Sequence, residues 1–383
     1  MNFVALKMLV GDRAKYFGII MGLTFASLLI TQQAAIFVGL MERTYGAITD
    51  VGLPDIWVSD PMVRFIDDAK PLQDTALYRV RGVDGIQWAV PLYKGLVKAR
   101  LPDGNFQTCN VLGLDDASLV GGPPKMLIGS LADLRQADSV IVDQVGATTK
   151  LARRVNGKLV PLKVGDTIEL NDHRANVVGI CEVARTFQSQ PVVYTTYTRA
   201  TNLAPRERQL LTFILVKAKP GVPLQALCDR IKTECRLGAY TQEQFVALTR
   251  DYYMKSTGIP INFGISIVLG FIVGTAIAGQ TFYNFTLDNL RHFGALKAMG
   301  APNGMLLRMI LMQSLVVGFV GYGLGVGVAS FIGFMSRKSE LAFKLPWWLL
   351  LASAGAILMI CMVSALISIR KVMKLEPAIV FKS

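Results

Sequence analysis

The sequence predicts a membrane protein with four transmembrane α-helices and a large α+β extracytoplasmic domain of two lobes between the first and second helices. The chain of 383 residues is 52% hydrophobic and only 17% charged, a balance typical of membrane proteins. Four stretches carry no charged residue, and each exceeds the roughly 20 apolar residues that cross a bilayer. These stretches are 16–41, 256–287, 309–336 and 345–369.

The first uncharged stretch predicts a transmembrane helix over residues 16–41. Its apolar length exceeds that of a signal-peptide core, and no small-x-small cleavage site follows at a suitable spacing. The sequence therefore predicts an uncleaved membrane anchor.

Residues 42–257 are predicted to form the extracytoplasmic (periplasmic) domain. The Pro-Asp-Gly-Asn sequence at 102–105 has the chemistry of a tight turn, so the runs on either side, 88–101 and 105–114, are predicted to form a hairpin. The glycine- and proline-rich segment 121–127 is predicted to separate two lobes. Further strands are predicted at 52–59, 139–143, 166–170, 176–182, 192–196 and 211–217, and helices at 74–83, 144–152 and 224–236. Short strands mixed with helices indicate an α+β domain.

Four of the five cysteines lie in this domain. Cys228 and Cys235 are seven residues apart in a predicted helix, which separates their Cα atoms by about 10 Å along its axis. That distance is too great for a disulfide. The sequence leaves open a bridge elsewhere, for instance between Cys109 and Cys181. No pair has zinc-ligand spacing and the chain has only two histidines, so no metal site is predicted.

The second uncharged stretch predicts transmembrane helix 2 and a cytoplasmic stalk over residues 258–288. A continuous helix over 261–287 would be about 40 Å long, which exceeds the hydrocarbon core. The polar end of this helix is therefore expected to project into the cytoplasm.

A short cytoplasmic helix is predicted within residues 289–302. Gly300 is placed to end it in a left-handed conformation, and Pro302 prevents its continuation. Phe293 and Leu296 share one face with Lys297 by helical spacing, and we expect this face to dock against a partner.

The last two uncharged stretches predict transmembrane helices over 305–336 and 345–369, with an external loop at 337–344 and a cytoplasmic tail at 370–383. Ten Lys or Arg residues lie near the N-terminus, in the segment between the second and third spans and in the C-terminal tail, which share one side of the membrane. The external loop on the other side has three. By the positive-inside rule, the N- and C-termini are cytoplasmic.

Small and polar residues inside the spans are candidates for packing or binding. Gly270 and Gly274 have the spacing at which helices approach closely, either as a dimer seam or within one chain. A candidate substrate region in or beside the first span consists of Gln32, Gln33 and Glu42. The plainer interpretation of the two glutamines is interhelical hydrogen bonding, and that of Glu42 is a charge at the membrane interface.

The sequence argues against catalysis by this chain itself. It has no G-x-x-x-x-G-K-[ST] phosphate loop, no G-x-S-x-G elbow and no H-E-x-x-H motif, so no catalytic residue and no bound cofactor is predicted. The extracytoplasmic segment carries a net charge of about +5 without a dense basic stripe or aromatic platforms, which excludes a nucleic-acid partner.

Residues 290–302 resemble the coupling segment of the permease subunits of MacB/FtsX-type (type VII) ABC transporters. That segment usually reads R-x-(I/F)-G-x-(L/M)-(K/R)-A-(L/M)-G-A, and this chain has RHFGALKAMGA beginning at Arg291. Many members of the family have Glu where this chain has His292. The resemblance implies that contact with an ATPase is made by Arg291, His292, Phe293, Gly294, Leu296, Lys297, Met299 and Gly300.

The resemblance covers nearly the whole chain. The sequence ALKML at 5–9 looks like the family's cytoplasmic N-terminal helix, which implies an amphipathic helix over 1–15. VGDT and VVGI in the extracytoplasmic domain are similar to the family's external domain, and IRK followed by EPA is similar to its C-terminal signature. GIPINFG at 258–264 is similar to the DevC-like branch.

This resemblance implies a homodimer in the bacterial inner membrane that works with two copies of a separate ABC ATPase, which binds ATP and Mg²⁺. Closure of the ATPases would move the coupling helices, and the stalks would rock the external domains to export a lipidic, amphiphilic or small hydrophobic substrate. The DevC-like branch implies a periplasmic adaptor (membrane fusion) protein, and membrane lipids are further partners.

Two other functions remain open. One is an FtsX-like transmembrane regulator of a periplasmic enzyme. The other is a haem- or lipoprotein-extracting permease, for which Glu42, Tyr45 and the Tyr252-Tyr253-Met254 group are the first candidates to bind haem.

Overall fold

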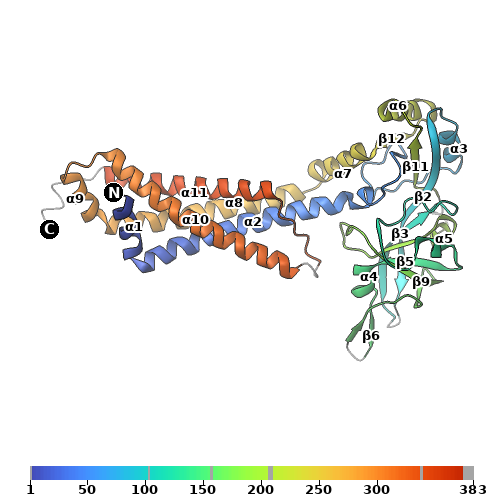
Figure 1. Ribbon diagram of the computed structural model, residues 1–383, viewed down its shortest axis with the longest axis horizontal. Coiled ribbons are helices and arrows are strands. Elements are labelled where there is room, and N and C mark those ends of the chain that lie inside the picture. The colour runs from blue at the N-terminus through green and yellow to red at the C-terminus, as the bar shows by residue number, and fades with distance from the viewer. Residues whose placement is uncertain (1, 102–103, 156–157, 206–209, 337–339, 374–383) are drawn as a thin grey trace. The chain divides into compact units, whose positions relative to one another are not determined.

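The computed structural model describes residues 2–101, 104–155, 158–205, 210–336 and 340–373, and it divides into two compact units (Figure 1). We call Met1–Leu40 together with Gly258–Ser383 the membrane unit, and Met41–Thr257 the external domain.

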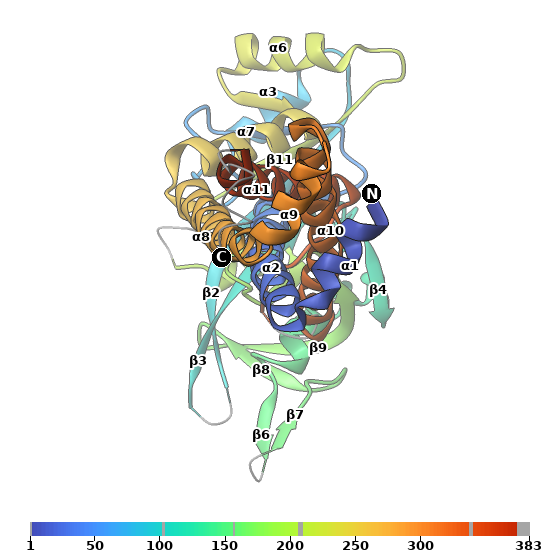
Figure 2. The same cartoon turned by 90° about the vertical axis from the view of Figure 1, so that its left-hand side faces the viewer.

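Four long helices of the membrane unit are apolar enough to cross a bilayer, as their uncharged stretches predict. They run side by side in Figure 1, with two short helices at one end of the bundle, and Figure 2 views the bundle from that end. In chain order the six helices are α1 (Asn2–Gly11), α2 (Arg13–Thr49), α8 (Ile259–Asp288), α9 (Leu290–Ala298), α10 (Asn303–Met335) and α11 (Trp347–Met373).

Two helices extend beyond their predicted C-terminal limits because charge ends an apolar stretch without ending a helix. α2 continues past the predicted limit at residue 41 to Thr49, since Glu42 and Arg43 are both good helix formers. α11 likewise continues past residue 369 to Met373. The part of the predicted tail at 374–383, and residues 337–339 of the predicted external loop, lie outside the described residues.

The amphipathic character predicted for the N-terminal helix is wrong. α1 is helical, but its apolar side chains point in every direction: Ala5 and Leu9 are buried, whereas Phe3 and Val10 are exposed. Its exposed side therefore mixes Lys7 with apolar side chains and forms no continuous polar face.

The external domain is built on one mixed sheet. Its strands follow the order β12-β1-β11-β2-β3-β10-β5-β9-β4, and β8 pairs with both β2 and β9. The strands are β1 (Ile56–Ser59), β2 (Ile86–Arg100), β3 (Phe106–Leu114), β4 (Lys125–Ile128), β5 (Ser139–Asp143), β8 (Thr167–Leu170), β9 (His173–Glu182), β10 (Val192–Thr196), β11 (Phe213–Ala218) and β12 (Gly238–Thr241), beside the separate hairpin β6 (Arg153–Val155) and β7 (Lys158–Val160).

The six helices of the external domain are short except for α6 and α7. They are α3 (Thr75–Arg81), η1 (Leu131–Arg135), α4 (Gln144–Thr148), α5 (Tyr197–Leu203), α6 (Leu224–Cys235) and α7 (Gln242–Ser256), counted over the described residues. The predicted helix at 144–152 therefore ends early, at Thr148.

The two lobes meet along β2 rather than at the predicted break over 121–127. The first half of β2 pairs with β11 from Ile86 to Leu92, and its second half pairs with β3 from Tyr93 to Arg100. β3 and β5, which lie on either side of the predicted break in the sequence, belong to the same sheet. The glycines and prolines at 121–127 therefore make a turn inside one lobe, and one long strand joins the lobes.

The order of the strands explains why the lobe boundary is hidden from the sequence. β1 pairs with β11 and β12, more than 150 residues further along the chain, so the first lobe is assembled from both ends of the external domain. Local composition carries no sign of such distant pairing, because turn residues report only where the chain reverses.

Candidate functional site

α9 is a nine-residue helix between two membrane-spanning helices, and both of its ends are fixed by backbone geometry. Gly300 has φ +90°, its N–H donates to the carbonyl of Lys297 at 3.0 Å, and the N–H of Ala301 donates to the carbonyl of Leu296 at 3.0 Å. This pair of bonds is a Schellman motif, which requires a residue in the left-handed region. The predicted stop at Gly300 is confirmed, and α10 begins directly after Pro302.

The inner face of α9 is buried in the membrane unit. Phe293 is fully buried among the side chains of Ala5, Leu306 and Ile369, which come from α1, α10 and α11. Leu296 is partly buried against the same cluster, and Gly294 is buried as well. The docking role predicted for Phe293 is therefore wrong, because a side chain enclosed by its own chain has no surface left for a partner.

The outer face of α9 is formed by the residues between these positions. Met299 is 76% exposed, and Arg291, His292, Ala295 and Ala298 are exposed beside it. Lys297 is half-buried. The surface open to a partner therefore combines one long apolar side chain, small alanines that allow close approach, and basic side chains.

Two contacts join other helices of the membrane unit close to α9, one between α2 and α8 and one between α10 and α1. Lys15 at the start of α2 pairs with Asp288, two residues before α9 begins, and with Asp12 at 2.8 Å. Gln313 of α10 is buried, and its Nε2 donates to the carbonyl of Ala5 in α1 at 2.7 Å. Sequence reasoning missed Gln313, although a polar residue inside an apolar span is the same signal that selected Gln32 and Gln33.

Gly270 and Gly274 are covered by the same chain, which contradicts a dimer seam at these positions. A Cβ on Gly270 would lie 3.4 Å from Leu29 Cβ, and one on Gly274 would overlap Ala26, both of them on α2. The glycines let α8 approach α2 within one chain, which was the second of the two interpretations.

The three residues of the predicted substrate region lie on α2, in two different units of the chain. Gln32 and Gln33 are half-buried on the part of α2 that belongs to the membrane unit. Glu42 is half-buried on the part of α2 that belongs to the external domain, and it has an interaction partner of its own.

The five cysteines are free and buried, so the bridge left open between Cys109 and Cys181 is absent. Burial raises the pKa of each of these two thiols to about 12, and the carboxylate of Asp143 adds to the effect. Both sulfurs therefore stay protonated at neutral pH and behave as small apolar side chains. Across the described residues, His, Cys, Asp and Glu nowhere gather in the groups of three that would hold a metal ion.

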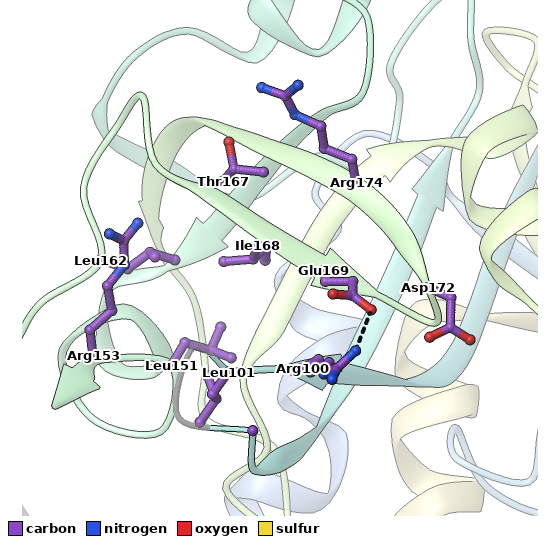
Figure 3. Close-up of a pocket in the computed structure, with 11 residues that line it drawn as sticks. Arg100, Leu101, Leu151, Arg153, Leu162, Thr167, Ile168, Glu169, Asp172 and Arg174 are labelled. Atoms are coloured by element: carbon purple, nitrogen blue, oxygen red, sulfur yellow. Dashed lines mark ion pairs between the residues drawn. The ribbon is translucent and has the colours of Figure 1, made fainter.

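One cavity of about 570 Å³ in the external domain is lined with charged residues near the end of β2 and beside β8 (Figure 3). Arg100 and Glu169 form an ion pair across it at 3.6 Å, and Arg174 points away from that pair. Arg153 pairs with Asp166 at 3.0 Å. With Asp166 counted, three arginines (Arg100, Arg153 and Arg174) face three carboxylates (Asp166, Glu169 and Asp172), so the cavity shows no excess of charge that would select an anion or a cation.

Family models match both units of this chain. The model of an FtsX-like permease C-terminal region matches residues 261–377, and the model of a MacB-like periplasmic core domain matches residues 17–234.

Similar proteins include permeases from a bacterium and an archaeon. An uncharacterised ABC transporter permease of Mycobacterium tuberculosis is 26% identical over 311 residues, covering 81% of this chain and 79% of the relative. An uncharacterised ABC transporter permease of Methanocaldococcus jannaschii is 25% identical over 195 residues, covering 49% of this chain and 48% of the relative.

Two solved structures of external regions are also similar. The periplasmic region of MacB from Actinobacillus actinomycetemcomitans is 16% identical with a TM-score of 0.37, covering 55% of this chain and 97% of that one. The extracellular domain of the transporter YknZ from Gram-positive bacteria is 10% identical with a TM-score of 0.34, covering 49% of this chain and 99% of that one.

Proposed function

This chain belongs to the family of FtsX-like ABC transporter permeases with a MacB-like periplasmic core domain, and we propose that it is the membrane subunit of an exporter driven by a separate ATPase. The observation that carries this proposal is the construction of α9. Its inner face is held by three other helices, and its outer face presents Met299.

A helix with these properties is suited to pass on a mechanical displacement. The Schellman motif at Gly300 fixes the direction in which the chain enters α10, and burial of Phe293 prevents α9 from moving independently of the bundle. A partner that pushes on the outer face of α9 therefore moves α8 and α10 together. We propose that two ATPase subunits, which bind ATP and Mg²⁺, supply this push as they close.

The remaining partners and the orientation follow from the same proposal. We propose that the basic residues near α9 and both termini face the cytoplasm, as the positive-inside rule favours. We further propose that the chain lies in the inner membrane of a bacterium with the external domain in the periplasm. We propose that the transporter is a homodimer surrounded by membrane lipids, that it uses a periplasmic adaptor as DevC-like members do, and that its substrate is lipidic, amphiphilic or small and hydrophobic. Because Gly270 and Gly274 are covered, the contact between the two copies uses other residues.

A charge on the outer face of α9 tests the coupling. We expect Met299→Asp to abolish co-purification of ATPase activity with the tagged chain from its native membrane, because a carboxylate placed at an apolar contact must be desolvated. Met62→Asp is the matched control, since Met62 is 68% exposed and lies in the external domain.

Vanadate-sensitive ATP hydrolysis in the purified complex is the measurement. Equal hydrolysis by the Met299→Asp variant, the Met62→Asp variant and the unmodified chain would remove the coupling role from α9. Two results together would instead favour the FtsX-like regulatory function. The unmodified complex would hydrolyse ATP, and cells that lack this chain would accumulate no lipidic or small substrate.

A further inference from the structure

A second cavity, of about 650 Å³, lies wholly within the external domain, and the coupling proposal leaves it unexplained. Its size is that of pockets that enclose small organic molecules. From its lining we infer that it binds an amphipathic small molecule with a flat apolar body and an N–H or O–H donor.

The lining of the cavity includes a buried hydrogen-bond acceptor that has no partner among the described residues. Asn110 in β3 is 2% exposed, and its Oδ1 accepts no hydrogen bond from the described residues. A buried acceptor that has lost water without gaining a donor destabilises the folded chain. A ligand that brings an N–H or O–H group to this oxygen would restore the missing bond.

The charged groups beside Asn110 do not demand a charged ligand. The Lys94 ammonium is buried and paired with the carboxylate of Asp67, so these two charges offset each other. Burial, together with the same carboxylate, raises the pKa of Tyr253, whose phenol therefore stays neutral. Lys70, the other charged residue of the lining, donates to the carbonyl of Met62 at 2.9 Å. Beside Asn110 the cavity thus favours a neutral polar group on its ligand over an ion.

The lining of the cavity also contains aromatic side chains. Phe65 stacks on Tyr252 with ring centroids 4.2 Å apart and planes 12° apart, and Tyr253 meets Phe65 edge-on at 5.5 Å. Phe187 joins them 5.0 Å from Tyr253. Aromatic rings that line a cavity bind flat apolar bodies through stacking and edge contacts.

The cavity also lies close along the chain to the membrane. Thr257 lines it, and α8 begins at Ile259, so the two residues are separated by at most about 7 Å of extended chain. The inference concerns binding, and it stands whether or not an ATPase drives this chain.

The test uses the full chain in lipid nanodiscs with N-phenyl-1-naphthylamine, a flat aromatic probe with a single N–H donor. We expect probe fluorescence to rise saturably above that of empty nanodiscs. Asn110→Leu is expected to weaken probe affinity about tenfold, which is the value of one hydrogen bond. Tyr252→Ala is expected to weaken it as well, whereas Tyr78→Ala, at a tyrosine 68% exposed on α3, is expected to leave it unchanged.

Thermal unfolding without probe separates a binding role of Asn110 from a structural one. An acceptor kept for a ligand predicts that Asn110→Leu unfolds at the same temperature or higher. A lower unfolding temperature together with unchanged probe affinity would overturn the proposal, because the amide would then serve the fold alone.

A variant that fills the cavity from its rim avoids the buried site. Leu96 lines the cavity and is 48% exposed, so Leu96→Trp adds bulk without disturbing the core. Loss of probe binding in this variant supports the site. Wild-type binding in both Leu96→Trp and Tyr252→Ala would place the probe elsewhere and overturn the proposal.

Discussion

In the membrane unit α10 and α2 approach each other closely at a glycine, whereas at the centre of the external domain three large aromatic rings pack against one another. A Cβ on Gly321 of α10 would lie 2.7 Å from Leu23 Cβ of α2. In the external domain the rings of Trp57, Phe213 and Phe245 lie within 5.8 Å of one another, and all three are buried.

This difference reflects the two solvents. In lipid, burying an apolar side chain gains little, so helices associate through close backbone packing. In water, each large apolar side chain stabilises the fold in proportion to the area that it buries. Removing volume is therefore expected to damage the external domain most, and adding volume to damage the membrane unit most.

The largest effect is expected from removing an aromatic side chain in the external domain. Trp57→Ala should lower the free energy of unfolding of this domain by about 3–5 kcal/mol, because it leaves a cavity between Phe213 and Phe245. Pulse proteolysis in increasing urea measures the change. Tyr78→Ala removes an exposed ring and should change the free energy by no more than about 0.5 kcal/mol. Equal losses of unfolding free energy in Trp57→Ala and Tyr78→Ala would contradict the burial of Trp57 and the exposure of Tyr78.

A smaller effect, of opposite origin, is expected from adding volume in the membrane unit. Gly321→Leu should destabilise the bundle by about 1–3 kcal/mol, because the new side chain meets α2. Gly323→Leu is the matched control, since nothing lies within 4 Å of a Cβ there. The stability of both variants is measured as the fraction of protein that stays monodisperse after heating in detergent. Tolerance of Gly321→Leu would mean that α2 and α10 do not approach as closely as described.

The smallest effect is expected at the end of α9. Gly300→Ala should cost about 1 kcal/mol, since φ +90° is unfavourable for a residue with a Cβ. Gly304→Ala in the first turn of α10, where a Cβ meets nothing within 4 Å, should leave stability unchanged or slightly raised. Amide hydrogen exchange of peptides that span α9 should become faster in the Gly300 variant alone. If amide hydrogen exchange is unchanged in Gly300→Ala, the Schellman motif is not what holds α9 in place for coupling.

Several features were determined by local sequence. The uncharged stretches predicted the four long helices, since few or no charges can be placed in the bilayer core. The turn residues near Gly104 predicted the hairpin of β2 and β3, and Gly300 with Pro302 predicted where α9 ends. Each of these features depends on neighbouring residues alone. The family resemblance separately predicted that the chain is an ABC transporter permease.

Only the tertiary structure decided which surfaces are used. α9 carries apolar side chains on two faces, and its sequence does not say whether Phe293 or Met299 turns inward; packing of α1, α10 and α11 around Phe293 settles it. The same holds for Gly274, whose neighbour on α2 is some 250 residues earlier in the chain. Asn110 looks like any strand asparagine until the tertiary fold buries its oxygen without a donor. Spacing in a sequence defines a face, but what that face touches depends on residues far away along the chain.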